Sequence, residues 1–179
     1  MLVSGRLAVS ICTFVAALSI AAGGQAPIDR RQEAQLRQLF PSVAGFAPKG
    51  GEPPHFTAFV NDPATGAQQP AGYAFWTTEL TPLERGYDGP IKILVGMDTT
   101  GVLTGIVVVD HHEPYGYFSV DTPVFREQFK GKDIRDPFRV GSDIDAVSRA
   151  TMTVTSSARA VRDSARRVAT KLLTPPAKP

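Results

Sequence analysis

Two apolar segments in the middle of the chain constrain its fold most strongly. Ile91–Met97 and Val102–Asp110 are rich in valine, isoleucine and leucine, and the second alternates at first before becoming continuously apolar. Between them, Asp98-Thr99-Thr100-Gly101 has the residue types of a tight turn. Two such runs separated by a short turn predict an antiparallel hairpin, the clearest one in this sequence.

Other segments extend this hairpin into a larger sheet with helices around it. The hydrophobic patterns predict an α+β fold with a central, largely antiparallel sheet and flanking helices. The expected strands are His55–Asn61, Gly72–Thr78 and a short one at residues 137–140, and a turn is expected at Asp62–Gly66. The expected helices are Ile28–Phe40, which Pro41 ends, Pro123–Phe129, and a last helix that runs to about Leu173.

The last helix carries an apolar stripe and a basic surface. Val161, Ala165, Val168 and Leu172 recur at spacings of four, three and four, which places them on one face. The other faces hold Arg159, Arg162, Arg166, Arg167 and Lys171. We interpret these cations as a solvated charged face, with contact to anionic lipid or an acidic partner as the alternative.

Residues 1–26 have the features of an export signal. Arg6 precedes an apolar or small run, Leu7–Ala22, and small residues follow it. The run is shorter than the roughly 20 residues of a comfortable membrane span, so cleavage is favoured over a retained membrane anchor. We therefore expect residues 27–179 to form the functional domain.

Composition restricts the chemistry that this domain can perform. The chain has 179 residues, 42% of them hydrophobic, which is enough for one domain with a real core. Its net charge of +2 does not indicate nucleic acid as a partner. Cys12, inside the export segment, is the only cysteine. The mature chain therefore has no disulfide, thiolate zinc site or cysteine-ligated cluster, and it needs an organic cofactor for any redox role.

Small and hydroxyl side chains gather just before the last helix. A helix N-terminus has unpaired N–H groups and a positive dipole end, which together favour a phosphate. Thr151 offers a hydroxyl that could form a phosphate ester, and Ala150 and Ser148 are small enough to admit a ring system. From the residues alone, the favoured interpretation is a helix cap without a ligand, formed by Thr153, Thr155, Ser156 and Ser157.

A longer pattern changes that interpretation. Asp145-x-x-Ser148-x-Ala150-Thr151 resembles the pattern Asp-x-x-Ser/Thr-Gly-Ala-Thr of the FMN-binding domain family. That family includes flavin subunits of the Rnf and sodium-pumping quinone reductase complexes and the periplasmic domain of NosR/NirI-type proteins. The chain is most similar to the NosR-type branch, on four further segments. They are Leu39-Phe40-Pro41, Pro48-Lys49-Gly50-Gly51, Arg85-Gly86-Tyr87-Asp88-Gly89-Pro90-Ile91 and His111-His112-Glu113-Pro114-Tyr115-Gly116-Tyr117.

The resemblance implies a cofactor and its attachment point. In the family, a flavin transferase takes FMN from FAD and links it through a phosphodiester to the last threonine of the pattern, which is Thr151 here. By the same resemblance, Asp145, Ser148, Ala150, Met152 and Thr153 lie in the attachment site. Arg149 departs from the family's glycine. Its guanidinium could pair with the cofactor phosphate, or its bulk could hinder the transferase.

Two loops are expected to contribute to the same site. The resemblance places Glu113, Pro114, Tyr115 and Gly116 near the flavin ring, and Tyr87 and Gly89 in a second turn beside it. The alternatives are a plain surface loop for the first and a strand-positioning turn for the second. Metal binding by His111, His112 and Glu113 is disfavoured, because adjacent side chains of an extended segment point in opposite directions. Phe75 and Trp76 are expected in the core.

These observations predict an extracytoplasmic flavoprotein that carries electrons and has no catalytic residues or metal of its own. The expected location is periplasmic, either released or anchored to the inner membrane. The expected partners are a flavin transferase and a membrane electron-transfer protein with iron–sulfur or quinone centres. One alternative is a NosR-like factor for the regulation or maturation of nitrous oxide reductase, and another is a binding module without flavin.

Overall fold

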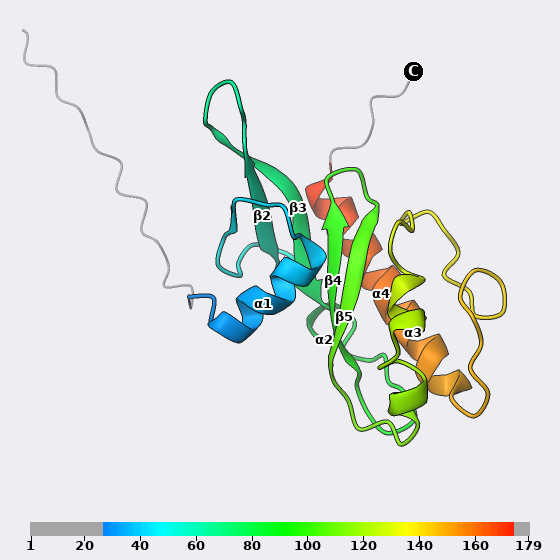
Figure 1. Cartoon of the computed structure of the whole chain (residues 1–179). Helices are drawn as coiled ribbons and strands as arrows, with labels where there is room; N and C mark the ends of the chain where they lie inside the picture. The colour runs from blue at the N-terminus through cyan, green and yellow to red at the C-terminus, as the bar shows by residue number, and fades with distance from the viewer. Residues whose placement is uncertain (1–26, 174–179) are drawn as a thin grey trace, which may run out of the picture.

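The chain folds around a five-stranded antiparallel sheet. The structure, a computed structural model, describes residues 27–173. The strands follow one another in the order β1-β2-β3-β4-β5, and each pairs antiparallel with its sequence neighbour (Figure 1). They are β1 (Gly45–Phe46), β2 (Phe56–Asn61), β3 (Gln68–Trp76), β4 (Lys92–Asp98) and β5 (Leu103–Asp110). The predicted α+β fold with a central antiparallel sheet and flanking helices is confirmed.

The two faces of the sheet each have their own hydrophobic core. Side chains alternate along a strand, so β4 sends Ile93, Val95 and Met97 to one face and Leu94 to the other. All four are fully buried. Both faces therefore need a helix to cover them, which explains the nearly continuous apolar run of this strand.

One helix covers each face. Figure 1 shows α1 (Arg30–Leu39) and α4 (Thr151–Leu172) on opposite sides of the sheet. Asp29 caps helix α1 by accepting a 2.8 Å hydrogen bond from the backbone N–H of Gln32, and the helix buries Leu36 and Leu39. Helix α4 packs its stripe, with Val161 and Val168 fully buried, into the larger core.

Three short elements complete the fold. They are α2 (Thr77–Leu80), the 3₁₀ turn η1 (Gly116–Phe118) and α3 (Pro123–Glu127). The predicted strand Gly72–Thr78 ends at Trp76, because the chain turns into α2 at Thr77. The hydroxyl of Thr77 accepts a hydrogen bond from the N–H of Ile93 and donates one to the carbonyl of Ile91, which connects α2 to β4. Phe75 and Trp76 are buried, as expected for core residues.

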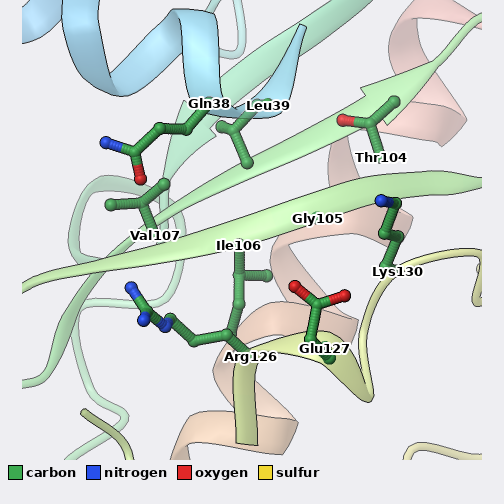
Figure 2. A pocket seen from close by; sticks show the side chains of 9 residues that line it. All are labelled: Gln38, Leu39, Thr104, Gly105, Ile106, Val107, Arg126, Glu127 and Lys130. Carbon is green, nitrogen blue, oxygen red and sulfur yellow. The ribbon is translucent and has the colours of Figure 1, made fainter. Parts of the chain in front are cut away.

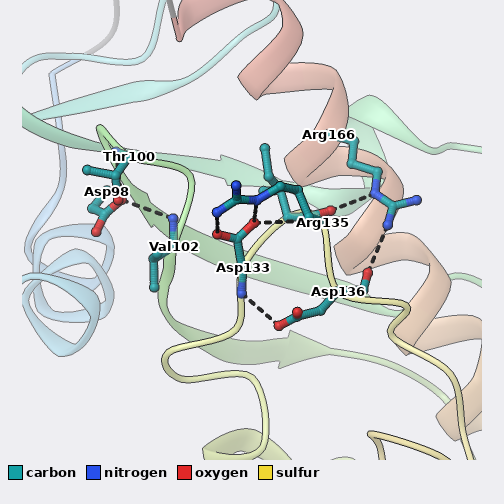
Figure 3. Close-up of polar contacts among 8 residues, drawn as sticks. Asp98, Thr100, Val102, Asp133, Arg135, Asp136 and Arg166 are labelled. Carbon is teal, nitrogen blue, oxygen red and sulfur yellow. Dashed lines mark hydrogen bonds and ion pairs between the residues drawn. The ribbon is translucent and has the colours of Figure 1, made fainter. Parts of the chain in front are cut away.

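The strand predicted at residues 137–140 is wrong. Phe138 has a φ of +50°, a left-handed backbone conformation that a strand does not accommodate. Only an isolated bridge between Val140 and Ile144 forms there. The preceding segment is instead fastened to α4 by Arg166, whose guanidinium donates to the carbonyls of Ile134 and Asp136 at 2.7 and 2.8 Å (Figure 3).

The basic residues of α4 are largely engaged within the protein. Arg167 donates to the carbonyl of Leu80, while Arg159 and Arg162 pair with Glu84 and Asp163. Together with the contacts of Arg166, these bonds show that the basic side chains of α4 hold neighbouring segments in place as well as facing solvent.

The expected export segment and Cys12 lie outside the described residues. Within residues 27–173, no helix combines the length and hydrophobicity that are needed to span a membrane.

Candidate functional site

A cavity of about 330 Å³ opens at the N-terminal end of α4. Three segments form its walls: the turn before β4, the loop after β5 and the start of α4. Every lining residue belongs to the set predicted from the sequence. The lining residues are Tyr87, Pro114, Tyr115, Arg149, Ala150, Thr151, Met152 and Thr153.

Thr151 is the first residue of α4 and is exposed at the edge of this cavity. The Ser/Thr-rich cap expected at Thr153–Ser157 is wrong, because the helix begins before it and these residues lie inside it. No side chain caps the helix. Within residues 27–173, the backbone N–H groups of Thr151, Met152 and Thr153 have no hydrogen-bond acceptor. These three N–H groups belong to residues that line the cavity, at the positive end of a 22-residue helix.

Arg149 occupies a left-handed backbone conformation. Its φ is +66°, a region that glycine enters freely and other residues enter at a cost of roughly 1–2 kcal/mol. The glycine in the family pattern is therefore explained by the backbone, since the chain must turn sharply into Ala150 and α4. Arg149 is exposed and lines the cavity, and its side chain forms no ion pair with the residues that the structure describes.

Glu113 lies behind the cavity wall and is not among its lining residues. The side chain is only 6% exposed. Its carboxylate accepts hydrogen bonds from the backbone N–H groups of Tyr87 and Asp88, at 3.0 and 2.9 Å, and from the hydroxyl of Thr153. The sequence predicts Glu113 near the ligand, and in the structure its carboxylate lies between the turn and α4.

His111 supports the loop that carries Glu113. Its Nδ1 accepts a 3.1 Å hydrogen bond from the backbone N–H of Glu113, and its Nε2 lies 2.9 Å from a carboxylate oxygen of Asp121. A neutral ring that accepts at Nδ1 carries its proton at Nε2, where it donates to Asp121. Both ring nitrogens are thus used within the loop, a role that the sequence pattern does not indicate.

Two glycines are required by close contacts in these loops. A Cβ on Gly116 would lie 2.1 Å from the ring of His111, and a Cβ on Gly86 would lie 2.3 Å from a carboxylate oxygen of Glu113. Gly86 was quoted in the matching segment but was not predicted as a site residue, because its contact depends on a residue far away in sequence.

The remaining predicted residues lie around the cavity without lining it. Gly89 closes the turn by accepting a 2.8 Å hydrogen bond from the N–H of Gly86, and it has a φ of +109°. Asp145 and Ser148 are exposed on the segment that leads into Arg149. The N–H of Asp145 donates to the side chain of Gln128, which anchors that segment near α3.

A second cavity, of about 230 Å³, lies between the end of α1, the edge strand β5 and α3 (Figure 2). Its lining residues differ entirely from those around Thr151. They are Gln38, Leu39, Thr104, Gly105, Ile106, Val107, Arg126, Glu127 and Lys130.

Comparison with known proteins identifies the class to which this site belongs. Residues 86–166 match the family described as the FMN-binding domain. The matched segment contains all three walls of the Thr151 cavity. The resemblance inferred from the sequence is thereby confirmed at the level of the family.

The chain is also similar in sequence to one curated relative. It is a component of the Na(+)-translocating ferredoxin:NAD(+) oxidoreductase complex of Acetobacterium woodii, and it is 29% identical over 76 residues. The matched stretch covers 38% of this chain and 37% of the relative. The chain therefore matches well under half the length of that relative.

The residues around Thr151 fit the phosphate of a flavin nucleotide. A phosphate would accept from the three unpaired N–H groups, and Arg149 supplies an unpaired cation beside them. The cavity has the size of a small-molecule pocket, for which roughly 300–1,000 Å³ is usual. Tyr87 and Tyr115 provide aromatic surface on two of its walls.

Proposed function

We propose that this chain is an electron-transfer domain that carries FMN on Thr151. The observation that carries the proposal is the position of Thr151. An exposed hydroxyl stands at the first residue of a long helix, beside three unpaired N–H groups and on the rim of a cavity. The family that residues 86–166 match supports FMN as the ligand.

The attachment is a group transfer from FAD. The Thr151 oxygen forms a bond to the phosphorus of the FMN half of FAD, while the bond between the two phosphates breaks. The hydroxyl loses its proton and AMP leaves. A flavin transferase is the proposed partner for this step. Because Thr151 is exposed, the oxygen is open to another protein.

Redox chemistry belongs to the flavin, and the chain holds and tunes it. The relative from Acetobacterium woodii is part of an oxidoreductase complex, which supports a role as one carrier in a chain. We propose a membrane electron-transfer partner with iron–sulfur or quinone centres, and an extracytoplasmic location. The pattern of residues 1–26 supports that location. The closer similarity to NosR-type proteins stays a prediction.

The domain boundary is also a proposal. The matched segment includes β4, β5 and most of α4, whereas α1 and β1–β3 precede it. Strand β3 pairs with β4, and α1 packs on the same sheet. This shared sheet supports residues 27–179 as one FMN-binding domain.

The test is a spectrum of the denatured protein. The full chain is co-expressed with a flavin transferase, unfolded, freed of loose flavin and examined in visible light. We expect a flavin spectrum that reductant bleaches reversibly before unfolding and that stays with the chain afterwards. Thr151→Ala should lose the retained flavin, and Thr155→Val, one turn further along α4, should keep it. Flavin that washes away equally from all three proteins would contradict covalent attachment.

A further inference from the structure

Glu113 connects all three walls of the Thr151 cavity. Peptide bonds connect it to Pro114 in the loop after β5. Its carboxylate reaches the turn before β4 through Tyr87 and the start of α4 through Thr153. Tyr87 and Thr153 both line the cavity, so the carboxylate is one hydrogen bond behind two of its walls.

All three donors to this carboxylate are neutral. Two are backbone N–H groups, and the third is a hydroxyl. None of the ion pairs formed within residues 27–173 includes Glu113. A buried carboxylate is usually paired with a cation or fully hydrogen-bonded, and the Glu113 carboxylate is stabilised by hydrogen bonds. Among the residues that the structure describes, no cation pairs with this carboxylate.

The backbone of Glu113 is fixed as well. Its N–H donates to His111, and the ring of His111 is held by Asp121 and packs on Gly116. Neither the carboxylate nor the peptide unit can move without breaking several hydrogen bonds. The charge is therefore held at a fixed place relative to Thr151, which preorganises the site.

We propose that Glu113 is a positioning residue that holds the three cavity walls together and lowers the reduction potential of a flavin bound there. This inference rests on the proposed function. Reduction adds an electron to the flavin, and a fixed negative charge nearby opposes that addition. The opposition is stronger in a poorly solvated interior than in water. Charge and hydrogen bonding behind the direct contacts are general means of tuning a cofactor.

The test compares two substitutions in the full chain. Glu113→Gln removes the charge and leaves one oxygen to accept where two accepted before. Thr153→Val removes the hydroxyl donor and keeps the charge. Both substitutions should weaken the hydrogen bonds that hold the cavity walls together, while only Glu113→Gln removes the charge. We expect Glu113→Gln to raise the midpoint potential of the bound flavin clearly more than Thr153→Val does.

A second readout uses the protein without flavin. Hydrogen exchange at the amides of Tyr87 and Asp88 reports directly on their bonds to Glu113. Exchange should be at least ten-fold faster in Glu113→Gln than in the unaltered chain, and amides in the middle of β4 should be unaffected.

The two readouts separate this inference from the proposed function. If Glu113→Gln binds flavin at an unchanged potential, the electrostatic role is wrong. If exchange at Tyr87 and Asp88 is unchanged, the positioning role is wrong. A wild-type chain that takes up no flavin would contradict the proposed function, and the exchange experiment would still decide the positioning role. If Glu113→Gln does not fold, faster exchange in Thr153→Val supports the positioning role and unchanged exchange contradicts it.

Discussion

The hydroxyl of Thr153 donates a hydrogen bond to the carboxylate of Glu113, across 40 positions of sequence. This bond joins the first turn of α4 to the loop after β5, and the same carboxylate joins both to the turn at Tyr87. The start of α4, where Thr151 is exposed, is therefore positioned by a buried charge and not by a capping side chain.

Gly86 should not tolerate a side chain. A Cβ there would lie 2.3 Å from the Glu113 carboxylate, so Gly86→Ala must displace the carboxylate or the turn. We expect a loss of about 1–3 kcal/mol in the free energy of unfolding, the usual cost of overpacking. Chemical denaturation measures it. Gly45→Ala is the matched control, because its Cβ would meet no atom within 4 Å. Equal stability of the two variants would contradict the close packing at Gly86.

Arg149 allows backbone and side-chain effects to be separated. At a φ of +66°, Arg149→Gly should relieve strain, whereas Arg149→Ala should retain it. We expect the glycine variant to be more stable than the alanine variant by about 1 kcal/mol in denaturant unfolding. If the guanidinium contacts the cofactor phosphate, both variants should attach less flavin than the unaltered chain. Alanine and glycine variants of equal stability would argue against the left-handed conformation.

The free energy of unfolding should fall in acid because of the ion pair between Asp133 and Arg135. The side-chain hydrogen bond from Arg135, together with its backbone N–H, lowers the pKa of Asp133 to about 2 (Figure 3). A carboxyl whose pKa is lower in the folded state stabilises the fold above its ordinary pKa of about 3.9. That contribution is lost as the pH falls from about 4 towards 2.

Thermal unfolding between pH 5 and pH 2 measures this effect, with the window set by the ordinary pKa of about 3.9 and its lowered value. The Tm of Asp133→Asn should fall less steeply with acid than that of the unaltered chain. Because the pair is largely at the surface, the difference should be small, a few degrees at most. Identical pH profiles would show that Asp133 makes no such contribution.

Much of the fold was predictable, because it depends on local patterns. Three predictions depend on residues that are close together in the sequence: the hairpin of β4 and β5, the apolar stripe of α4, and the end of α1 before Pro41. All three are confirmed. The strand predicted at residues 137–140 is wrong, because the left-handed backbone at Phe138 does not fit a strand. The start of α4 was placed too late, because hydroxyl residues suggested a cap where they instead face the core.

The site was predictable in part. The residues that line the cavity could be named, because they belong to short motifs with a known chemical pattern. The role of Glu113 could not be inferred, because its partners are 25 to 40 positions away and meet only in the folded chain. The left-handed backbone at Arg149 was signalled only by the glycine of the family pattern.

The central claim is the attachment of FMN to Thr151, and peptide mass spectrometry tests it most directly. Trypsin cleaves after Arg149 and Arg159, which releases a peptide from Ala150 to Arg159 with Thr151 near its start. After co-expression with a flavin transferase, this peptide should carry the mass of FMN in phosphodiester linkage, and fragmentation should place it on Thr151. A peptide without that mass, or with the mass on Thr153 or Thr155, would contradict the account.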